Sequence, residues 1–119
     1  MRFRRSSRLR DSAGFRAVLR GGRRTTARHF LVYALANGLD CARLGLIVGA
    51  RAERSAVRRN SFKRLVREAF RARQAELAGL DVVVQLRVGG SGRPVGRALL
   101  DELNGIFAIL NKWRASSSD

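Results

Sequence analysis

The sequence predicts an α+β fold, a two-layer sandwich of helices packed on a β-sheet. Apolar residues recur at helical and extended spacings in the order α-β-β-α-β-α along the chain. The length of 119 residues, 45% of them hydrophobic, provides one compact core but not two independent ones. We therefore expect a single domain over residues 1–119, with flexible ends at residues 1–10 and 115–119.

The first half of the chain predicts one helix and two strands. A short helix should begin with Asp11 or Ser12 as its cap and end at the glycine pair 21–22. The segments HFLVYALA (29–36) and ARLGLIVGA (42–50) are rich in aromatic and β-branched residues, which favours strands. The intervening NGLD is a turn signal, so we expect these strands to form an antiparallel hairpin.

The second half predicts a long helix, a third strand and a closing helix. The helix covers residues 55–77, and AGLDVVVQLRV (78–88) follows as a strand with a continuous valine run. If this strand runs parallel to the one before it, the fold is an α/β sandwich. After a glycine-rich loop, Pro94 suits a first helical turn. Apolar residues then recur at helical spacing: Val95, Leu99, Leu100, Leu103, Ile106, Phe107, Leu110 and Trp113.

The charge balance is typical of a protein that binds a polyanion. There are 25 Lys and Arg against 9 Asp and Glu, a net charge of +16, and such self-repulsion opposes compaction unless it is screened. No apolar run approaches the roughly 18 residues of a membrane-spanning helix. Cys41 is the only cysteine, which excludes an intrachain disulfide and suits a cytoplasmic protein.

The helix at 55–77 has an apolar side and an adjoining basic arc. The apolar side consists of Phe62, Leu65, Val66, Ala69 and Phe70, and the arc of Arg59, Asn60, Lys63, Arg64, Arg67 and Arg71. A solvated face usually mixes charge signs, whereas like charges one turn apart are destabilising. Arg54, Arg58 and Arg59 also oppose the helix dipole. We therefore expect phosphates, rather than neighbouring side chains, to be the counter-charges.

A basic amphipathic helix is also typical of membrane-surface binding. This alternative is disfavoured because the helix lies between two predicted strands, and the sheet needs its apolar side.

At this helix, AVRRNSFKRLVREAF resembles the signature of bacterial ribonuclease P protein components, in which an Arg-Asn-Arg core precedes a Lys-Arg pair. GFRAVLRGGRR, RHFLVYAL, RLGLIVGAR and LDVVVQLR follow in the order and spacing of the family, so the resemblance covers roughly residues 8–113. It implies a ribosomal-protein-like fold in which the basic helix is the crossover between two parallel strands.

The resemblance also implies a function. The chain would assist a catalytic RNA in endonucleolytic removal of the 5′ leader from precursor tRNA, by binding that RNA, one to one, and the single-stranded leader. Chemistry and Mg²⁺ would then belong to the RNA, with no catalytic residue and no confidently assigned metal site in the protein.

Two groups of binding residues follow. Arg59, Asn60, Lys63, Arg64 and Arg67 match the helix that contacts the catalytic RNA, and the charge argument adds Arg54, Arg58 and Arg71. Phe15, Leu31 and Tyr33 match the leader-binding cleft between the first helix and the sheet, with Leu19 and Arg51 at neighbouring positions. Leu31 and Tyr33 share a strand face, and aromatic rings stack on bases regardless of sequence. Ordinary core packing is the alternative for Phe15 and Tyr33.

The sequence departs from the family pattern at several positions. Ser61 stands where the signature has its second arginine, so one phosphate contact is missing or is supplied by Arg58. Ser55 remains a suitable helix cap. Leu19 replaces a frequent aromatic residue, and Ala50 replaces a basic one, which leaves Arg51.

Other function classes fit less well. A metal-dependent nuclease needs clustered carboxylates or histidines, but the acids are scattered and His29 stands alone. A non-enzymatic ribosomal or RNA-assembly protein would share the charge and the basic helix, although it would not need the aromatic cleft. No pattern predicts a helix-turn-helix for DNA binding.

Overall fold

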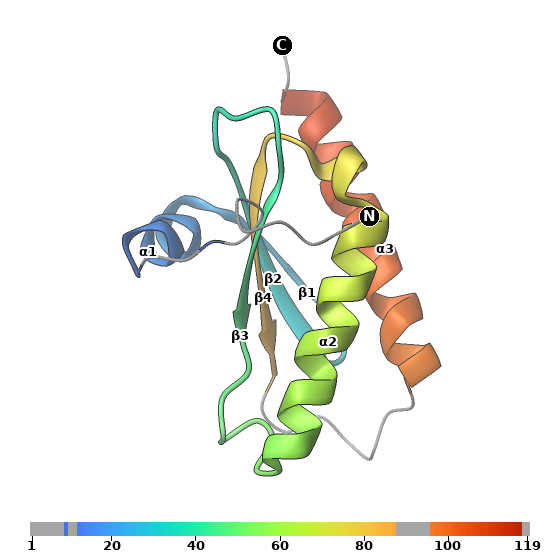
Figure 1. Cartoon of the computed structure of the whole chain (residues 1–119). Coiled ribbons are helices and arrows are strands. Elements are labelled where there is room, and N and C mark those ends of the chain that lie inside the picture. Colours follow the sequence, from blue (N-terminus) through green and yellow to red (C-terminus); the bar gives the residue numbers. More distant parts are fainter. Residues whose placement is uncertain (1–8, 10–11, 88–95, 118–119) are drawn as a thin grey trace.

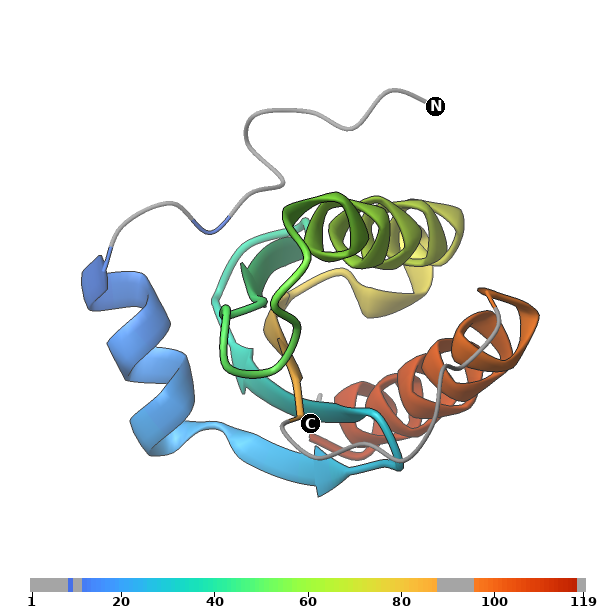
Figure 2. The same cartoon turned by 90° about the horizontal axis from the view of Figure 1, so that it is seen from below.

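The computed structural model describes Leu9, residues 12–87 and residues 96–117. Its elements in chain order are α1 (Ser12–Gly21), β1 (Arg23–Thr26), β2 (Phe30–Ala36), β3 (Arg43–Ile47), α2 (Ala56–Ala72), the 3₁₀ helix η2 (Gln74–Leu77), β4 (Leu80–Leu86) and α3 (Gly96–Ser117). The predictions for residues 1–8, the glycine-rich loop and Pro94 lie outside the described residues. Figures 1 and 2 show α1 on one face of the sheet and α2 with α3 on the other.

The four strands lie in the order β1-β2-β4-β3. β2 is antiparallel to both β1 and β4, whereas β3 and β4 are parallel. A parallel pair needs a crossover connection, and α2 supplies it. The α+β class and the crossover through the basic helix are therefore confirmed.

The predicted hairpin of residues 29–36 and 42–50 is wrong. β4 lies between β2 and β3 and pairs with both. The physical reason is burial, because six of the seven residues of β4 are buried and such a strand requires neighbours and covered faces on both sides. The turn signal between the two predicted strands describes only the local chain reversal and carries no information about this insertion.

The sequence analysis also missed β1. Its residues, Arg-Arg-Thr-Thr, contain no apolar side chain and show no hydrophobic alternation. The strand exists because its backbone pairs with β2 along its whole length. The helix predicted over 55–77 is likewise divided, since α2 ends at Ala72 and η2 follows it.

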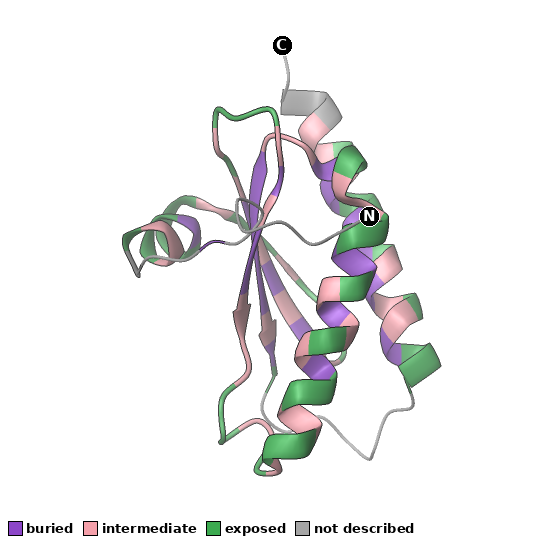
Figure 3. Cartoon of the chain, viewed as in Figure 1, coloured by how far each residue is buried: buried purple, intermediate pink, exposed green. Residues whose placement is uncertain are grey.

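The main core lies between the sheet and the helices α2 and α3. From α2 it receives Phe62, Val66, Ala69 and Phe70, all buried. The ring of Phe70 meets that of Phe107 in α3 edge to face, with 6.3 Å between centroids. Figure 3 shows the buried positions concentrated in the strands and on the inner sides of these two helices. A smaller cluster on the α1 side contains Leu9, Val18 and Val83.

Buried or half-buried acids fix the two ends of the sheet. At one end, Asp81 accepts two hydrogen bonds of 2.7 Å from the guanidinium of Arg43 and one of 2.9 Å from Asn37. At the other, Glu102 of α3 accepts from the backbone amides of His29 and Phe30 and contacts His29 Nδ1 at 2.8 Å. The lone histidine is thus engaged in tying the start of β2 to α3.

Gly22 sets the tight connection from α1 to β1. Its amide donates to the carbonyl of Val18, and a Cβ atom at this position would lie 2.3 Å from that same carbonyl oxygen. Any side chain would therefore push the helix end away from β2. The predicted helix stop at the glycine pair is confirmed, since α1 ends at Gly21.

Among the helices of the described residues, none combines the length and the apolar composition that a bilayer crossing requires.

Replacement of Glu102 by alanine should lower the free energy of unfolding by about 1–3 kcal/mol, because two backbone amides and a half-buried imidazole lose their acceptor. Asp101→Ala is the matched control: its carboxylate is exposed and adjacent in sequence, so its removal should change stability by less than about 0.5 kcal/mol. Urea denaturation of both variants measures the difference, and equal effects would contradict the role given to Glu102.

Candidate nucleic-acid interface

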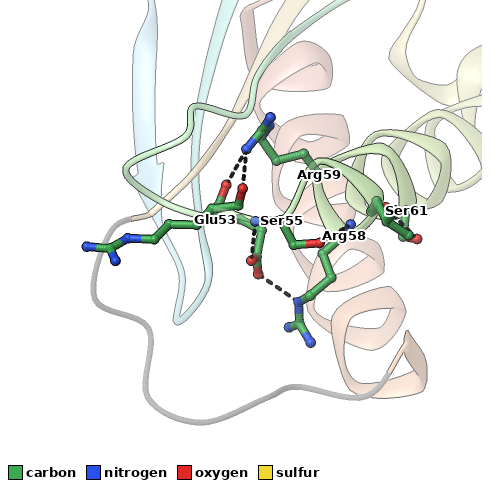
Figure 4. Close-up of polar contacts among 7 residues, drawn as sticks. Glu53, Ser55, Arg58, Arg59 and Ser61 are labelled. Carbon is green, nitrogen blue, oxygen red and sulfur yellow. Dashed lines mark hydrogen bonds and ion pairs between the residues drawn. The ribbon is translucent and has the colours of Figure 1, made fainter.

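The start of α2 is held by a cap and by one acidic residue outside the helix. Ser55 has extended backbone geometry, and its Oγ accepts from the Arg58 amide at 3.2 Å, so the predicted cap is confirmed. Glu53 lies two residues earlier. One of its carboxylate oxygens accepts from the Ser55 amide at 3.1 Å and the other from Arg58 Nε at 2.7 Å (Figure 4).

This ion pair corrects the expectation about counter-charges. The prediction that phosphates rather than neighbouring side chains compensate the arginines at the helix start is wrong for Arg58, whose partner is Glu53. The sequence analysis missed Glu53 because it considered only the basic residues around the helix start and not the acid two residues before the cap. The acid lies where the helix dipole favours negative charge.

Arg59 is also anchored, but by neutral groups. Its Nη1 donates to the backbone carbonyls of Glu53 at 2.8 Å and of Arg54 at 2.9 Å (Figure 4). These bonds orient the guanidinium without neutralising its charge. Arg59 therefore remains a cation at the end of the basic arc, and its orientation is set by the loop that enters α2.

The predicted basic arc exists along the outer side of α2. Asn60, Arg64, Arg67 and Arg71 line one shallow depression of about 450 Å³, with Glu68 as the acid beside them. Arg64 and Arg71 are exposed, whereas Lys63 and Arg67 are partly buried. Four of the eight residues predicted to contact the catalytic RNA are thus brought together on one concave strip, and Lys63 lies one turn after Arg59.

Arg58 does not belong to this arc. It lines a different depression, of about 310 Å³, with Ser61, Phe62 and Leu65 of α2 and with Gly96 and Leu99 of α3. At about 100° per residue, Arg58 and Lys63 are roughly 140° apart around the helix. Because the Arg58 side of α2 faces α3 and the buried side faces the sheet, the residues of the arc's depression lie on the outer side of the helix.

The Ser61 hydroxyl is turned back on its own helix, where it donates to the Val57 carbonyl at 3.1 Å. Arg58 lines the same depression, as expected if it replaces a basic side chain at position 61, although its Nε is bound to Glu53. Arg54 lies exposed just before the cap.

On the opposite face of the sheet, α1 covers only part of the strands. Near its start, the ring of Phe15 lies on the backbone of Gly45 in β3, where a Cβ atom would stand 2.7 Å from Cε1 and Cζ. Near its end, Gly21 adjoins Leu35 of β2. The helix therefore runs across the sheet from β3 to β2, as Figure 2 shows. Gly45 was missed in the sequence because only the approach of Phe15 gives it a role.

The part of this face beyond α1 we call the open sheet surface. The strand register places Leu31 opposite Gln85, and Gln85 opposite Ile47, so one row runs across β2, β4 and β3. Tyr33 belongs to the next row, opposite Val83. The surface comprises Leu31, Tyr33, Ile47 and Gln85, all partly exposed. The sequence analysis missed Ile47 and Gln85, because only the register brings them beside Leu31.

The structure brings three of the five predicted leader-binding residues together on this face: Phe15, Leu31 and Tyr33. Leu31 and Tyr33 form part of the open sheet surface, and Phe15 packs with Tyr33 against the small cluster under α1. Leu19, 36% exposed, follows Phe15 by one helical turn. Arg51 is exposed in the connection from β3 to α2, four residues after Ile47. Phe15 and Tyr33 are neither fully buried nor isolated, so each combines packing with an accessible ring.

Within the residues that the structure describes, no three His, Cys, Asp or Glu side chains are grouped closely enough to hold a metal ion.

Comparison with known sequences gives consistent matches. The family model described as Ribonuclease P matches residues 3–111. The ribonuclease P protein component of Chromobacterium violaceum is 42% identical over 117 residues, 98% of this chain and 96% of the relative. That of Nitrosomonas europaea is 49% identical over 83 residues, 70% of each chain.

Solved structures agree with these matches. The RNase P protein of Staphylococcus aureus superposes with a TM-score of 0.78 at 27% identity, over 87% of this chain and 94% of that one. The RNase P protein of Thermotoga maritima, in complex with 1-(4-fluorophenyl)-2-thiourea, gives a TM-score of 0.76 at 31% identity, over 88% and 98% of the two chains.

Proposed function

This chain belongs to the ribonuclease P protein family, and on that premise we propose how its surfaces divide the work of RNA binding. It is a ribonuclease P protein component of the bacterial type, the RNA-binding subunit of an endoribonuclease that acts in tRNA 5′ processing. A net charge of +16 on 119 residues is in keeping with that role. A ribosomal or RNA-assembly protein is not favoured as an alternative.

We propose that the RNA subunit carries the catalytic centre and binds the Mg²⁺ ions. In this chain the one histidine and its carboxylate partner, His29 and Glu102, already hold β2 against α3. The protein would contribute affinity and positioning, as one copy for each RNA subunit. Its single cysteine, Cys41, is compatible with a cytoplasmic holoenzyme.

The basic arc of α2 is the proposed contact with the catalytic RNA. Its cations are spaced one helical turn apart and line a concave strip, so they can follow a phosphate backbone. The strip contains Asn60, whose amide can both donate to and accept from RNA. Arg59 would place its anchored guanidinium at the end of the strip. Arg58 would contact RNA on the α3 side of the helix.

The open sheet surface is the proposed site of the single-stranded 5′ leader of precursor tRNA. Phe15 and Tyr33 offer rings on which bases can stack, Leu31 and Ile47 offer apolar contact, and Arg51 offers a cation next to β3. The basic arc lies on the outer side of α2, and α2 itself packs beside β3. A substrate could therefore extend from the catalytic RNA around the β3 edge onto this surface.

A cleavage assay tests the assignment as a whole. With a bacterial-type catalytic RNA at low Mg²⁺, addition of this protein should accelerate removal of the 5′ leader from precursor tRNA, because the cationic surfaces replace part of the charge screening by Mg²⁺. The control is the RNA alone at the same ionic strength. A rate that does not change with protein would reduce the chain to a generic RNA binder.

Lys63→Ala and Arg64→Ala should each weaken binding to the catalytic RNA. Loss of one phosphate contact should lower the slope of log K against log salt by about one, without unfolding the chain. Lys112→Ala, an exposed cation near the end of α3, is the matched control and should leave the slope unchanged. Titrations at several salt concentrations measure it. If all three variants behave alike, the arc has no special role.

Tyr33→Ala should weaken binding of leader-bearing precursor tRNA more than binding of mature tRNA, by about 1–3 kcal/mol for one lost stacking contact. Tyr33→Phe retains the ring and should retain the discrimination. The measurement is the ratio of the two dissociation constants for the reconstituted holoenzyme. An equal loss for both ligands would mean that Tyr33 only packs against Val18 and Val83.

A further inference from the structure

The edge strand β1 carries two adjacent arginines on opposite faces of the sheet. Arg23 is paired with Ala34, whose side chain lies in the main core, and its guanidinium carbon is 4.3 Å from the ring centroid of Trp113 in α3. This cation–π contact fixes Arg23 on the α3 side. Arg24 is paired with Tyr33 and therefore lies on the opposite face, beside the open sheet surface.

Arg24 is exposed, and it makes no side-chain hydrogen bond or ion pair with any residue that the structure describes. Side chains directly opposite each other on antiparallel strands have Cβ atoms about 5 Å apart. A permanently charged, bidentate donor thus stands next to an accessible aromatic ring. That combination suits one nucleotide of single-stranded RNA, with the base on Tyr33 and a phosphate on Arg24.

We propose that Arg24 binds a backbone phosphate of the leader at the β1 edge, where the leader leaves the sheet. This proposal rests on the proposed leader site. It adds one binding residue, Arg24, and the direction in which the leader runs over the sheet, from β3 toward β1. Three strand spacings of about 4.8 Å separate β1 from β3. Arg24 therefore lies about 14 Å from the β3 edge of the sheet, and Arg51 comes shortly after β3 in the chain. Only leaders long enough to cross the sheet reach Arg24.

The experiment compares Arg24→Gln with Arg23→Gln in the holoenzyme, using precursor tRNAs whose leaders increase in length by single nucleotides. Both changes remove one charge from neighbouring positions of β1. Arg24→Gln should weaken binding roughly fivefold at low salt for long leaders and have no effect on the shortest ones. The slope of log K against log salt for long leaders should fall by about 0.7. Arg23→Gln should leave the leader-length profile unchanged.

A loss on Arg24→Gln that is the same at every leader length, or one matched by Arg23→Gln, would overturn the proposal. Arg24→Lys, which keeps the charge, should restore most of the affinity for long leaders, and failure to do so in a variant with a wild-type melting temperature would also count against it. Tyr33→Ala separates the two levels of inference. If Tyr33→Ala weakens binding of leader-bearing tRNA more than of mature tRNA while Arg24→Gln has no effect, only the Arg24 contact fails; if Tyr33→Ala weakens both equally, the leader site itself fails.

Discussion

The insertion of β4 between β2 and β3 is the constraint on which both candidate RNA surfaces depend. Val82 and Val84 point into the main core under α2 and α3, and Val83 points into the small cluster under α1. One strand therefore anchors both helical layers. Because β4 is parallel to β3, the chain must return to the other end of the sheet before β4 begins. The returning segment is α2, which carries the basic arc.

The distribution of charge shows how a chain with net charge +16 can stay folded. Within the described residues, four of the nine acids contact basic side chains: Glu53, Glu76 and Asp81 pair with arginines, and Glu102 contacts the imidazole of His29. Three of these acids stabilise particular parts of the fold: Glu53 the start of α2, and Asp81 and Glu102 the two ends of the sheet. In the depression along the arc of α2, three arginines are lined up with one acid, Glu68. Positive charge is therefore in excess where the polyanion is proposed to bind.

The helix start illustrates that folding and binding share residues. Arg58 completes an ion pair with Glu53, and Arg59 secures the loop carbonyls before the cap, so neither arginine is there for RNA alone. Both retain donor groups beyond these bonds, since only Nε of Arg58 and Nη1 of Arg59 are used in them. Intramolecular anchoring reduces the conformational entropy that a long side chain loses when it binds a phosphate.

The sequence by itself determined the fold class, the basic helix with its Ser55 cap, and the division of α2 into apolar and cationic sides, because these follow from local periodicity and capping chemistry. Long-range pairing decided the rest. It inserted β4 between β2 and β3 and added the polar strand β1 to the sheet. It also set the register, which places Arg24 beside Tyr33 and Ile47 beside Gln85, residues that are far apart in the chain. No local pattern encodes such contacts, since the free energy that selects them is gained only when the sheet is assembled.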